Sequence, residues 1–156
     1  MEAKFESSQW NQVEEVELIF KSKVKASQRP KVTSSDAAYK IFLQTWDINK
    51  IELVEEFKVM LLNRANKVMS VFCVSSGGVT GTVADPKIIF AAALKRAACN
   101  IILCHNHPSG ELSPSKADEE LTNKMVGGGK FLDIKVLDHL IVSSEGYFSF
   151  ADQGLL

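Results

Sequence analysis

The sequence IILCHNHPSGELSPSKAD occupies residues 101–118, and it indicates both the fold and the chemistry to expect of this chain. Its first four residues are apolar, which is typical of a short strand buried on both faces. His105 and His107 follow at once, so we expect them at the carboxyl end of that strand, where open α/β sheets bind ligands. The stretch continues in the pattern H-x-H-P-x6-S-x-x-D and ends at Asp118.

Three side chains of this stretch form a candidate metal site. Two imidazoles one residue apart can both reach a zinc ion, and Asp118 can return as a third, oxygen ligand. The fourth tetrahedral position then stays open to water, as in catalytic zinc sites, whereas structural sites are closed and usually contain cysteine. We therefore predict that His105, His107 and Asp118 bind a Zn²⁺ cofactor.

Ser115 has two compatible interpretations. The spacing Ser115-x-x-Asp118 is typical of a helix start, with serine as the N-cap and an acidic residue at the third position. A helix N-terminus also points its hydrogen-bond donors toward negative charge that develops during a reaction. We therefore predict that Ser115 caps a helix and stabilises an oxyanion as a catalytic residue.

The sequence on either side of this stretch predicts an α/β fold. The expected elements are a strand within 13–24, a helix from Ser34 or Ser35 to Trp46, a hairpin of strands 52–62 and 68–74, a helix from Asp85-Pro86 to residue 98, the strand 101–104, a helix over 115–126 closed by Gly127–Gly129, and strands 132–142 and 147–150. The helix over 88–98 is apolar almost all round, so we expect it to be sandwiched. Residues 75–82 are rich in glycine and form either a connector or a rim beside the substrate. This order predicts a sheet layered with helices.

Composition and charge narrow the possible functions. The chain has 156 residues and a net charge of −1, which argues mildly against DNA as the main partner. Its three cysteines lie in apolar runs without C-x-x-C spacing, so we expect buried free thiols in a reducing compartment. The N-terminus lacks the apolar core of a signal peptide, and no apolar run reaches the ~18–20 residues of a membrane span. We expect a cytoplasmic protein without a membrane partner.

Two superficial matches are set aside. The letters HNH at residues 105–107 resemble the name of a nuclease motif, but that name describes residues dispersed over a larger metal-binding unit. A zinc deaminase requires H-x-E followed by P-C-x-x-C, and neither pattern occurs.

The H-x-H-P-x6-S-x-x-D spacing resembles that of the JAMM (MPN+) metallohydrolases, and the surrounding sequence is similar to the RadC family. The similar segments are IILCHNHPSG at 101–110, VLDHLIV at 136–142, SSGG at 75–78 and Asp85-Pro86-Lys87. The resemblance covers roughly residues 30–156, so we divide the chain into an N-terminal extension, 1–30, with a flexible start, and a RadC-like domain, 31–156. It implies a cytidine-deaminase-like three-layer α/β/α sandwich with a mixed sheet. It also implies a zinc-dependent hydrolase of peptide or isopeptide bonds.

The resemblance also implies a glutamate on the strand before the metal motif. Glu55 and Glu56 are both candidates, and the family pattern E-x-F places the residue at Glu55, two before Phe57. Because neighbouring strand residues face opposite sides, only one of them can face the site. In the expected mechanism Glu55 accepts a proton from metal-activated water and passes it to the leaving amine, while Ser115 donates to the oxyanion.

Other roles and functions stay open at this point. His139 is either a residue that orients a metal ligand or a hydrogen-bonded core residue. Cys104 adjoins the ligands, but it faces away from His105 if the strand persists, so we exclude it from the metal site. RadC relatives often carry the label of DNA repair, so the alternative function is a metal-binding module in DNA transactions without protease activity. The longer relatives have a helical N-terminal part for which this sequence has no room, so we expect DNA binding still less. A metal-dependent nuclease is a third option.

Overall fold

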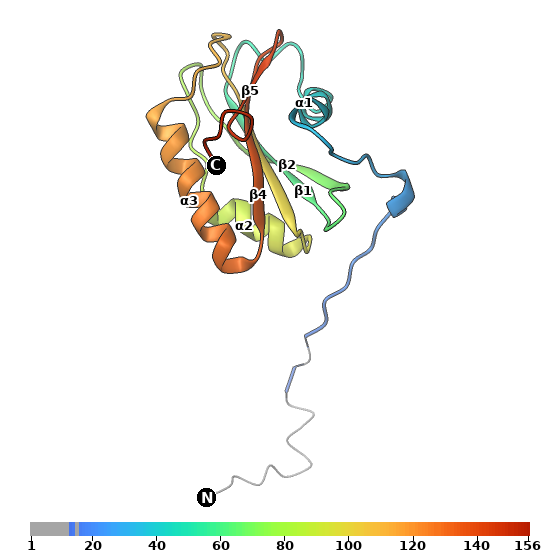
Figure 1. The fold of residues 1–156 in the computed structure, drawn as a ribbon. Coiled ribbons are helices and arrows are strands. Elements are labelled where there is room, and N and C mark those ends of the chain that lie inside the picture. The colour runs from blue at the N-terminus through green and yellow to red at the C-terminus, as the bar shows by residue number, and fades with distance from the viewer. Residues whose placement is uncertain (1–12, 15) are drawn as a thin grey trace, which may run out of the picture.

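The centre of the molecule is a five-stranded mixed sheet with the strand order β2-β1-β3-β4-β5 (Figure 1). The computed structural model describes residues 13–14 and 16–156. β3 and β4 run parallel, and the other neighbouring strands are antiparallel. The strands are β1 (Glu56–Leu62), β2 (Val68–Ser76), β3 (Asn100–Asn106), β4 (Lys135–Val142) and β5 (Tyr147–Ser149).

Helices cover both faces of this sheet. α1 (Ser35–Leu43), preceded by the 3-10 turn η2 (Ala26–Gln28), lies on one face, and α2 (Pro86–Lys95) and α3 (Lys116–Leu132) lie on the other (Figure 1). The core divides accordingly. Phe42 of α1 packs with one set of strand side chains that includes Cys104, whereas Ile89 of α2 and Met125 of α3 pack with the alternate set. The predicted three-layer α/β/α sandwich with a mixed sheet is confirmed.

Each main helix begins at the residue type that the sequence predicted. The side chain of Ser34 accepts a hydrogen bond from the backbone N–H of Ala37, and that of Asp85 accepts one from Lys87 with Pro86 next in the chain. Ser115 caps α3. These caps satisfy backbone donors that have no partner within the helix, which explains why the starts were predictable from local sequence.

The strand predicted within residues 13–24 is not formed in the part of this segment that the structure describes. Residues 16–24 have no regular secondary structure. A strand requires a neighbour for its backbone hydrogen bonds, and none of the described residues pairs with this segment; Val16 and Leu18 are each 88% exposed. The start of the chain, predicted to be mobile, lies outside the described residues.

The three glycines predicted to end α3 lie inside it. The helix continues to Leu132, and Asp133, with φ of 55°, forms the C-cap. A Cβ at Gly129 would lie 2.2 Å from the carbonyl oxygen of Ile134, and one at Gly128 would lie 2.8 Å from the Phe90 ring. The glycines therefore allow close packing of α3 against its neighbours and do not terminate it.

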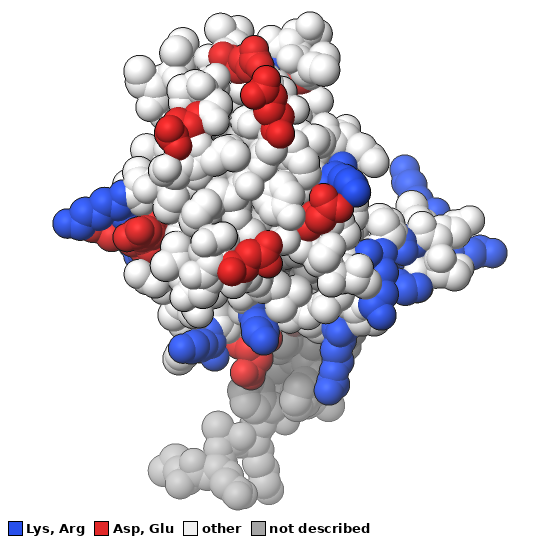
Figure 2. All heavy atoms as spheres, turned by 45° about the horizontal axis from the view of Figure 1, so that its top comes forward, with Lys and Arg blue, Asp and Glu red and all other residues white. Residues whose placement is uncertain are grey.

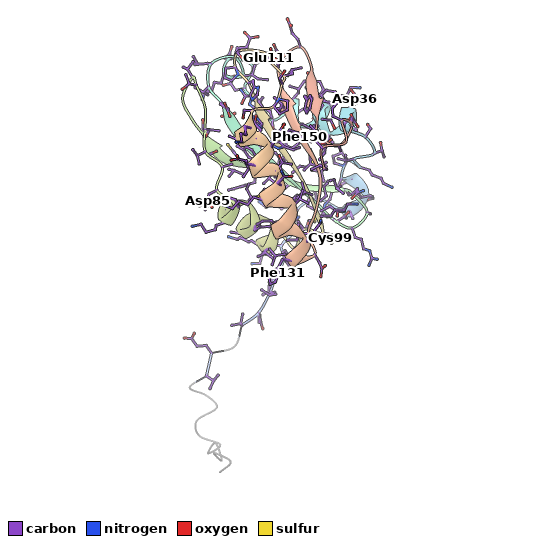
Figure 3. The ribbon with its side chains drawn as sticks, turned by 60° about the vertical axis from the view of Figure 1, so that its left-hand side comes forward. Asp36, Asp85, Cys99, Glu111, Phe131 and Phe150 are labelled. Atoms are coloured by element: carbon purple, nitrogen blue, oxygen red, sulfur yellow. The ribbon has the colours of Figure 1, made fainter. Side chains whose placement is uncertain are left out.

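Two predictions about burial are also wrong. α2 buries Ile89 and Ala93, but Ile88 and Leu94 are exposed because the helix packs on the sheet with one face only. Cys73 and Cys99 are exposed as well, and only Cys104 is the expected buried thiol. Cys73 lies on the edge strand β2, and Cys99 lies just before β3 at the end opposite the Glu111 loop (Figure 3). Border positions of this kind remain open to solvent despite their apolar sequence context.

Candidate metal centre

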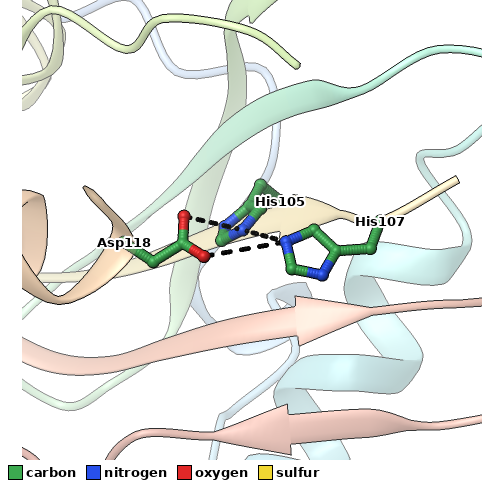
Figure 4. Close-up of side chains that lie close together, drawn as sticks. All are labelled: His105, His107 and Asp118. Atoms are coloured by element: carbon green, nitrogen blue, oxygen red, sulfur yellow. Dashed lines mark hydrogen bonds and ion pairs between the residues drawn. The ribbon is translucent and has the colours of Figure 1, made fainter. Parts of the chain in front are cut away.

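The three predicted ligands converge at the carboxyl end of β3. His105 lies in β3, His107 directly follows the strand, and Asp118 lies in the first turn of α3. The Nε2 atoms of the two histidines are 3.0 Å apart. Oδ1 of Asp118 is 3.2 Å from Nε2 of His105, and Oδ2 is 3.7 Å from Nε2 of His107. Figure 4 shows the Asp118 carboxylate facing both imidazole rings.

These distances match the size of a metal ion. A tetrahedral ion with ligand bonds of about 2.0–2.1 Å holds its donor atoms about 3.3–3.4 Å apart. The three observed separations, 3.0, 3.2 and 3.7 Å, lie on either side of that value. Two imidazole nitrogens and one carboxylate suit zinc and also other divalent first-row ions. The residues therefore fit a metal ion, and the arrangement does not identify which one.

Local hydrogen bonds hold two of the ligands in the orientation that metal binding requires. Nδ1 of His107 lies 2.5 Å from the carbonyl oxygen of Glu111, which can only accept, so the ring proton is on Nδ1 and the Nε2 lone pair is free. Ser115 and Asp118 form a capping box, in which the N–H of Ser115 donates to Oδ2 of Asp118 at 2.7 Å. The helix cap thus also orients a candidate metal ligand.

The site's electrostatics favour an ionised carboxylate. Burial by itself raises the pKa of Asp118, but its contacts with the imidazole rings of His105 and His107 outweigh this effect and hold the pKa well below its usual range. The same interaction raises the pKa of His107, against a smaller opposing effect of burial. The negative charge needed for a cation is therefore present at neutral pH.

Glu55 faces this site and Glu56 does not. Glu55 immediately precedes β1 and lines a cavity of about 590 Å³ together with His107, Ser115 and Asp118. Residues 79–82 of the glycine-rich segment line the same cavity, as expected for a rim. Oε2 of Glu56 lies 3.7 Å from Nζ of Lys58, a buried side chain on the face of β1 away from the candidate metal site. The structure thus brings Glu55 and Ser115 together with the predicted ligands.

Asn106 has a structural role that the sequence did not reveal. Its side chain is fully buried, and its Oδ1 accepts from the backbone N–H of Glu56 at 2.7 Å. Its Nδ2 donates to the carbonyl oxygens of Ile51, at 2.7 Å, and Val54, at 2.9 Å. Asn106 therefore holds the segment that carries Glu55. The position of an amide between two histidines was the only available signal, and it does not specify these partners.

Three further residues near the site, His139, Asp138 and Cys104, have different surroundings and contacts. His139 is fully buried with Nε2 2.8 Å from Nδ1 of His105, and burial, with a smaller contribution from His105, lowers its pKa well below the usual value. Asp138 accepts hydrogen bonds from Ser149 and the backbone of Ala151, so it fastens the C-terminal turn. Cys104 lies in the core on the α1 side, as predicted, away from the ligands.

Comparison with known proteins identifies relatives of this chain. A family model described as "RadC-like JAB domain" matches residues 32–155. A UPF0758 protein of Flavobacterium johnsoniae is 50% identical over 101 residues, which are 65% of this chain and 44% of the relative. One from Symbiobacterium thermophilum is 47% identical over 103 residues, 66% of this chain and 44% of the relative. One from Clostridioides difficile is 34% identical over 125 residues, 76% of this chain and 53% of the relative.

The chain thus spans about half the length of the curated relatives that it matches, or less. Within the described residues, no helix is both long and apolar enough to cross a bilayer.

Proposed function

Because this chain belongs to the RadC-like JAB domain family, we propose that it is a metal-dependent hydrolase that cleaves a peptide or isopeptide bond. The convergence of His105, His107 and Asp118 carries this proposal, because three ligands of this kind leave a coordination position for water. His107 and Asp118 line a cavity whose walls also include Glu55 and Ser115. A structural metal site has no need of such a cavity or of an adjacent carboxylate.

The residues around the cavity would divide the chemistry among them. A bound divalent ion such as Zn²⁺ supplies Lewis acidity, which lowers the pKa of a coordinated water from about 15.7 toward about 7. Glu55 would accept a proton from the attacking water as the water's oxygen bonds to the substrate carbonyl carbon, and it would return the proton to the amine when the carbon–nitrogen bond breaks. The Ser115 hydroxyl donates to the carbonyl oxygen as negative charge develops there, help worth ~3–4 kcal/mol in comparable sites.

The charges near the site favour a carbonyl substrate over a phosphodiester. In the described part of the chain, the charged residues that line the cavity are acidic apart from His107, and a smaller neighbouring cavity has Glu52 and Glu145 in its walls. Neither cavity contains Lys or Arg, the residues that typically bind phosphate. Figure 2 shows Asp and Glu side chains over the upper and middle parts of the face in view, and most Lys and Arg side chains toward its sides and lower edge. These observations also give no support to the DNA-binding alternative.

The test is to measure bound metals in the purified protein and then to screen a peptide library for cleavage. We expect about one divalent ion per chain and cleavage that stops when a chelator is added and resumes when the metal is restored. The same preparation is assayed with a phosphodiester substrate and for retardation of duplex DNA at low salt. Cleavage of the phosphodiester without any peptide cleavage would overturn the proposal. Salt-dependent DNA binding without hydrolysis would favour the alternative of a non-catalytic module.

A further inference from the structure

We propose that His139 and Thr122 are positioning residues that fix the tautomer of His105, so that its Nε2 lone pair faces the metal position. The inference depends on the proposed function only in assuming that His105 binds a metal. It assigns roles to two residues that do not line the cavity beside the site. A path of hydrogen bonds leaves His105 from Nδ1, the ring nitrogen that does not face Asp118, and ends at the backbone of Asp118.

The path consists of three short contacts between buried groups. Nδ1 of His105 is 2.8 Å from Nε2 of His139, and Nδ1 of His139 is 2.6 Å from Oγ1 of Thr122. Oγ1 of Thr122 is 2.6 Å from the carbonyl oxygen of Asp118. The side chains of His105, His139 and Thr122 are 0–1% exposed, so water does not compete for these positions. His105 is thus connected to the backbone of Asp118 through His139 and Thr122, in addition to the direct contact between the His105 and Asp118 side chains.

The end of the path sets the direction of every hydrogen bond in it. The Asp118 carbonyl can only accept, so at 2.6 Å the Thr122 hydroxyl must donate to it. Oγ1 of Thr122 then accepts from His139, which places the ring proton of His139 on Nδ1. Nε2 of His139 is left as an acceptor, and His105 donates to it from Nδ1. A neutral His105 therefore has its free lone pair on Nε2, the atom that faces Asp118 and His107.

Aromatic packing prevents the two rings from turning out of this arrangement. Phe57 stacks on His105 with ring centroids 5.7 Å apart and an interplanar angle of 6°. Phe150 stacks on His139 with centroids 4.8 Å apart and an angle of 12°. A 180° flip of either histidine ring would put carbon atoms where the nitrogens now make these hydrogen bonds, and it would require these neighbours to move.

A β-bulge brings His139 to this position. In the parallel pairing of β3 and β4, Ile101 lies opposite Val136 and Ile102 lies opposite Asp138, so Leu137 is left without a partner. Regular alternation would place residue 138, and not 139, on the same face as Val136. The extra residue shifts the alternation and directs His139 to the face of His105. Bulges next to functional sites commonly redirect a side chain in this way.

The first test is the metal affinity of Thr122 variants, measured by competition with a chromophoric chelator. Thr122→Val keeps the side-chain shape but removes the acceptor for His139, so both rings can adopt the opposite tautomer. We expect Zn²⁺ to bind about 10–100-fold more weakly, the usual loss when a partner of a ligating histidine is removed. Thr122→Ser keeps the hydroxyl and should bind within a few-fold of the original protein. Met125→Leu is the matched control, because Met125 is buried on the same helix and packs in the apolar core.

The second test reads the tautomers directly by ¹⁵N NMR of the imidazole rings in the metal-free protein. The sequence contains only three histidines, so the signals can be assigned from single variants. We expect the proton on Nδ1 in both His105 and His139, and a mixture or reversal in Thr122→Val. A proton on Nε2 of His139 in the original protein would overturn the inference, as would unchanged metal affinity in Thr122→Val. If Thr122→Val does not fold, Thr122→Ser and the spectrum of the original protein still decide.

These tests separate the inference from the proposed function. Should the original protein bind metal but cleave no peptide, the proposed function fails and the affinity measurements still apply. Should it bind no metal at all, the proposed function fails and the tautomers of the metal-free protein still test the hydrogen-bond path.

Discussion

The candidate metal ligands and the candidate base are held by two different kinds of structure. His105 and Asp118 lie on regular elements, and the buried side chains of His139 and Thr122 support them from behind. Glu55 lies in the segment before β1, and the polar side chain that holds this segment is Asn106. The two sides of the cavity are therefore supported by different contacts, although Asn106 and His105 are neighbours on β3. Metal binding and turnover should accordingly be separable by mutation.

The support of Glu55 also includes the glycine-rich segment. The N–H of Gly77 donates to the carbonyl oxygen of Glu55 at 2.8 Å, and the N–H of Glu55 donates to Gly78 at 3.2 Å. A Cβ at Gly77 would lie 2.1 Å from the carbonyl oxygen of Gly81, so the segment folds back on itself at a position that only glycine fits. The candidate base is positioned by backbone contacts with the glycine-rich segment and by the Asn106 side chain, whereas the candidate ligands His105 and Asp118 are supported by packed side chains.

The largest effect is expected on the ligand side. Asp118→Ala or His107→Ala should reduce the bound metal from about one ion per chain to background and abolish hydrolysis, because two ligands do not hold the ion. Elemental analysis after dialysis measures this. Glu111→Ala is the control, since the backbone carbonyl of Glu111, and not its carboxylate, contacts His107. Undiminished metal in the ligand variants would show that these residues do not form the site.

On the other side of the cavity, Glu55→Gln should leave metal content unchanged and reduce kcat by about 10²–10⁴-fold, the usual contribution of a general acid–base group. Glu56→Gln is the matched control, because the neighbouring side chain interacts with Lys58 on the opposite face of β1. Its kcat should stay within a few-fold of the original. The comparison would break if Glu56→Gln inactivated the enzyme and Glu55→Gln did not.

A smaller effect is expected from Asn106→Asp, which sharpens the distinction between the two supports. The carboxylate still accepts from Glu56 but cannot donate to Ile51 and Val54, so the segment that carries Glu55 should loosen. We expect a lower melting temperature and a kcat about tenfold lower at unchanged metal content, because a misplaced catalytic group slows the reaction.

The control for this variant is Asn100→Asp, at the other end of β3. It removes the donor to Asn66 and should lower stability without lowering the kcat of the folded fraction. Equal losses of kcat in the two variants would indicate a general effect of stability.

The sequence predicted those parts of the site whose determinants are local. His105, His107 and Asp118 are separated by a short segment, and a strand followed by a capped helix brings them together almost regardless of the rest of the fold. The helix starts were predictable for the same reason. Glu55 is distant in sequence, and the family pattern alone distinguished it from Glu56.

The contributions that sequence analysis missed depend on tertiary contacts. The bulge at Leu137 decides which face His139 occupies, and regular alternation cannot reveal an unpaired residue. Asn106 contacts backbone carbonyls of a segment far away in the sequence. Gly127–Gly129 predicted a helix end because glycine is common just after the last turn of a helix. In the structure, Gly128 and Gly129 instead leave room for Phe90 and for the carbonyl of Ile134.

The close approach of Gly129 to the carbonyl of Ile134 affects Asp118, because both residues lie on the single helix α3, near opposite ends. Residues 118 and 129 are separated by about 16 Å along a helix that rises 1.5 Å per residue. A larger side chain at 129 would collide with the carbonyl of Ile134 and force the axis to pivot. A pivot of only about 5° would swing the carboxylate of Asp118 by about 1.4 Å, several times the ~0.2 Å within which metal–ligand distances are held. Glycine at position 129, with a hydrogen atom where alanine has a methyl group, thus keeps the Asp118 carboxylate within reach of His105 and His107.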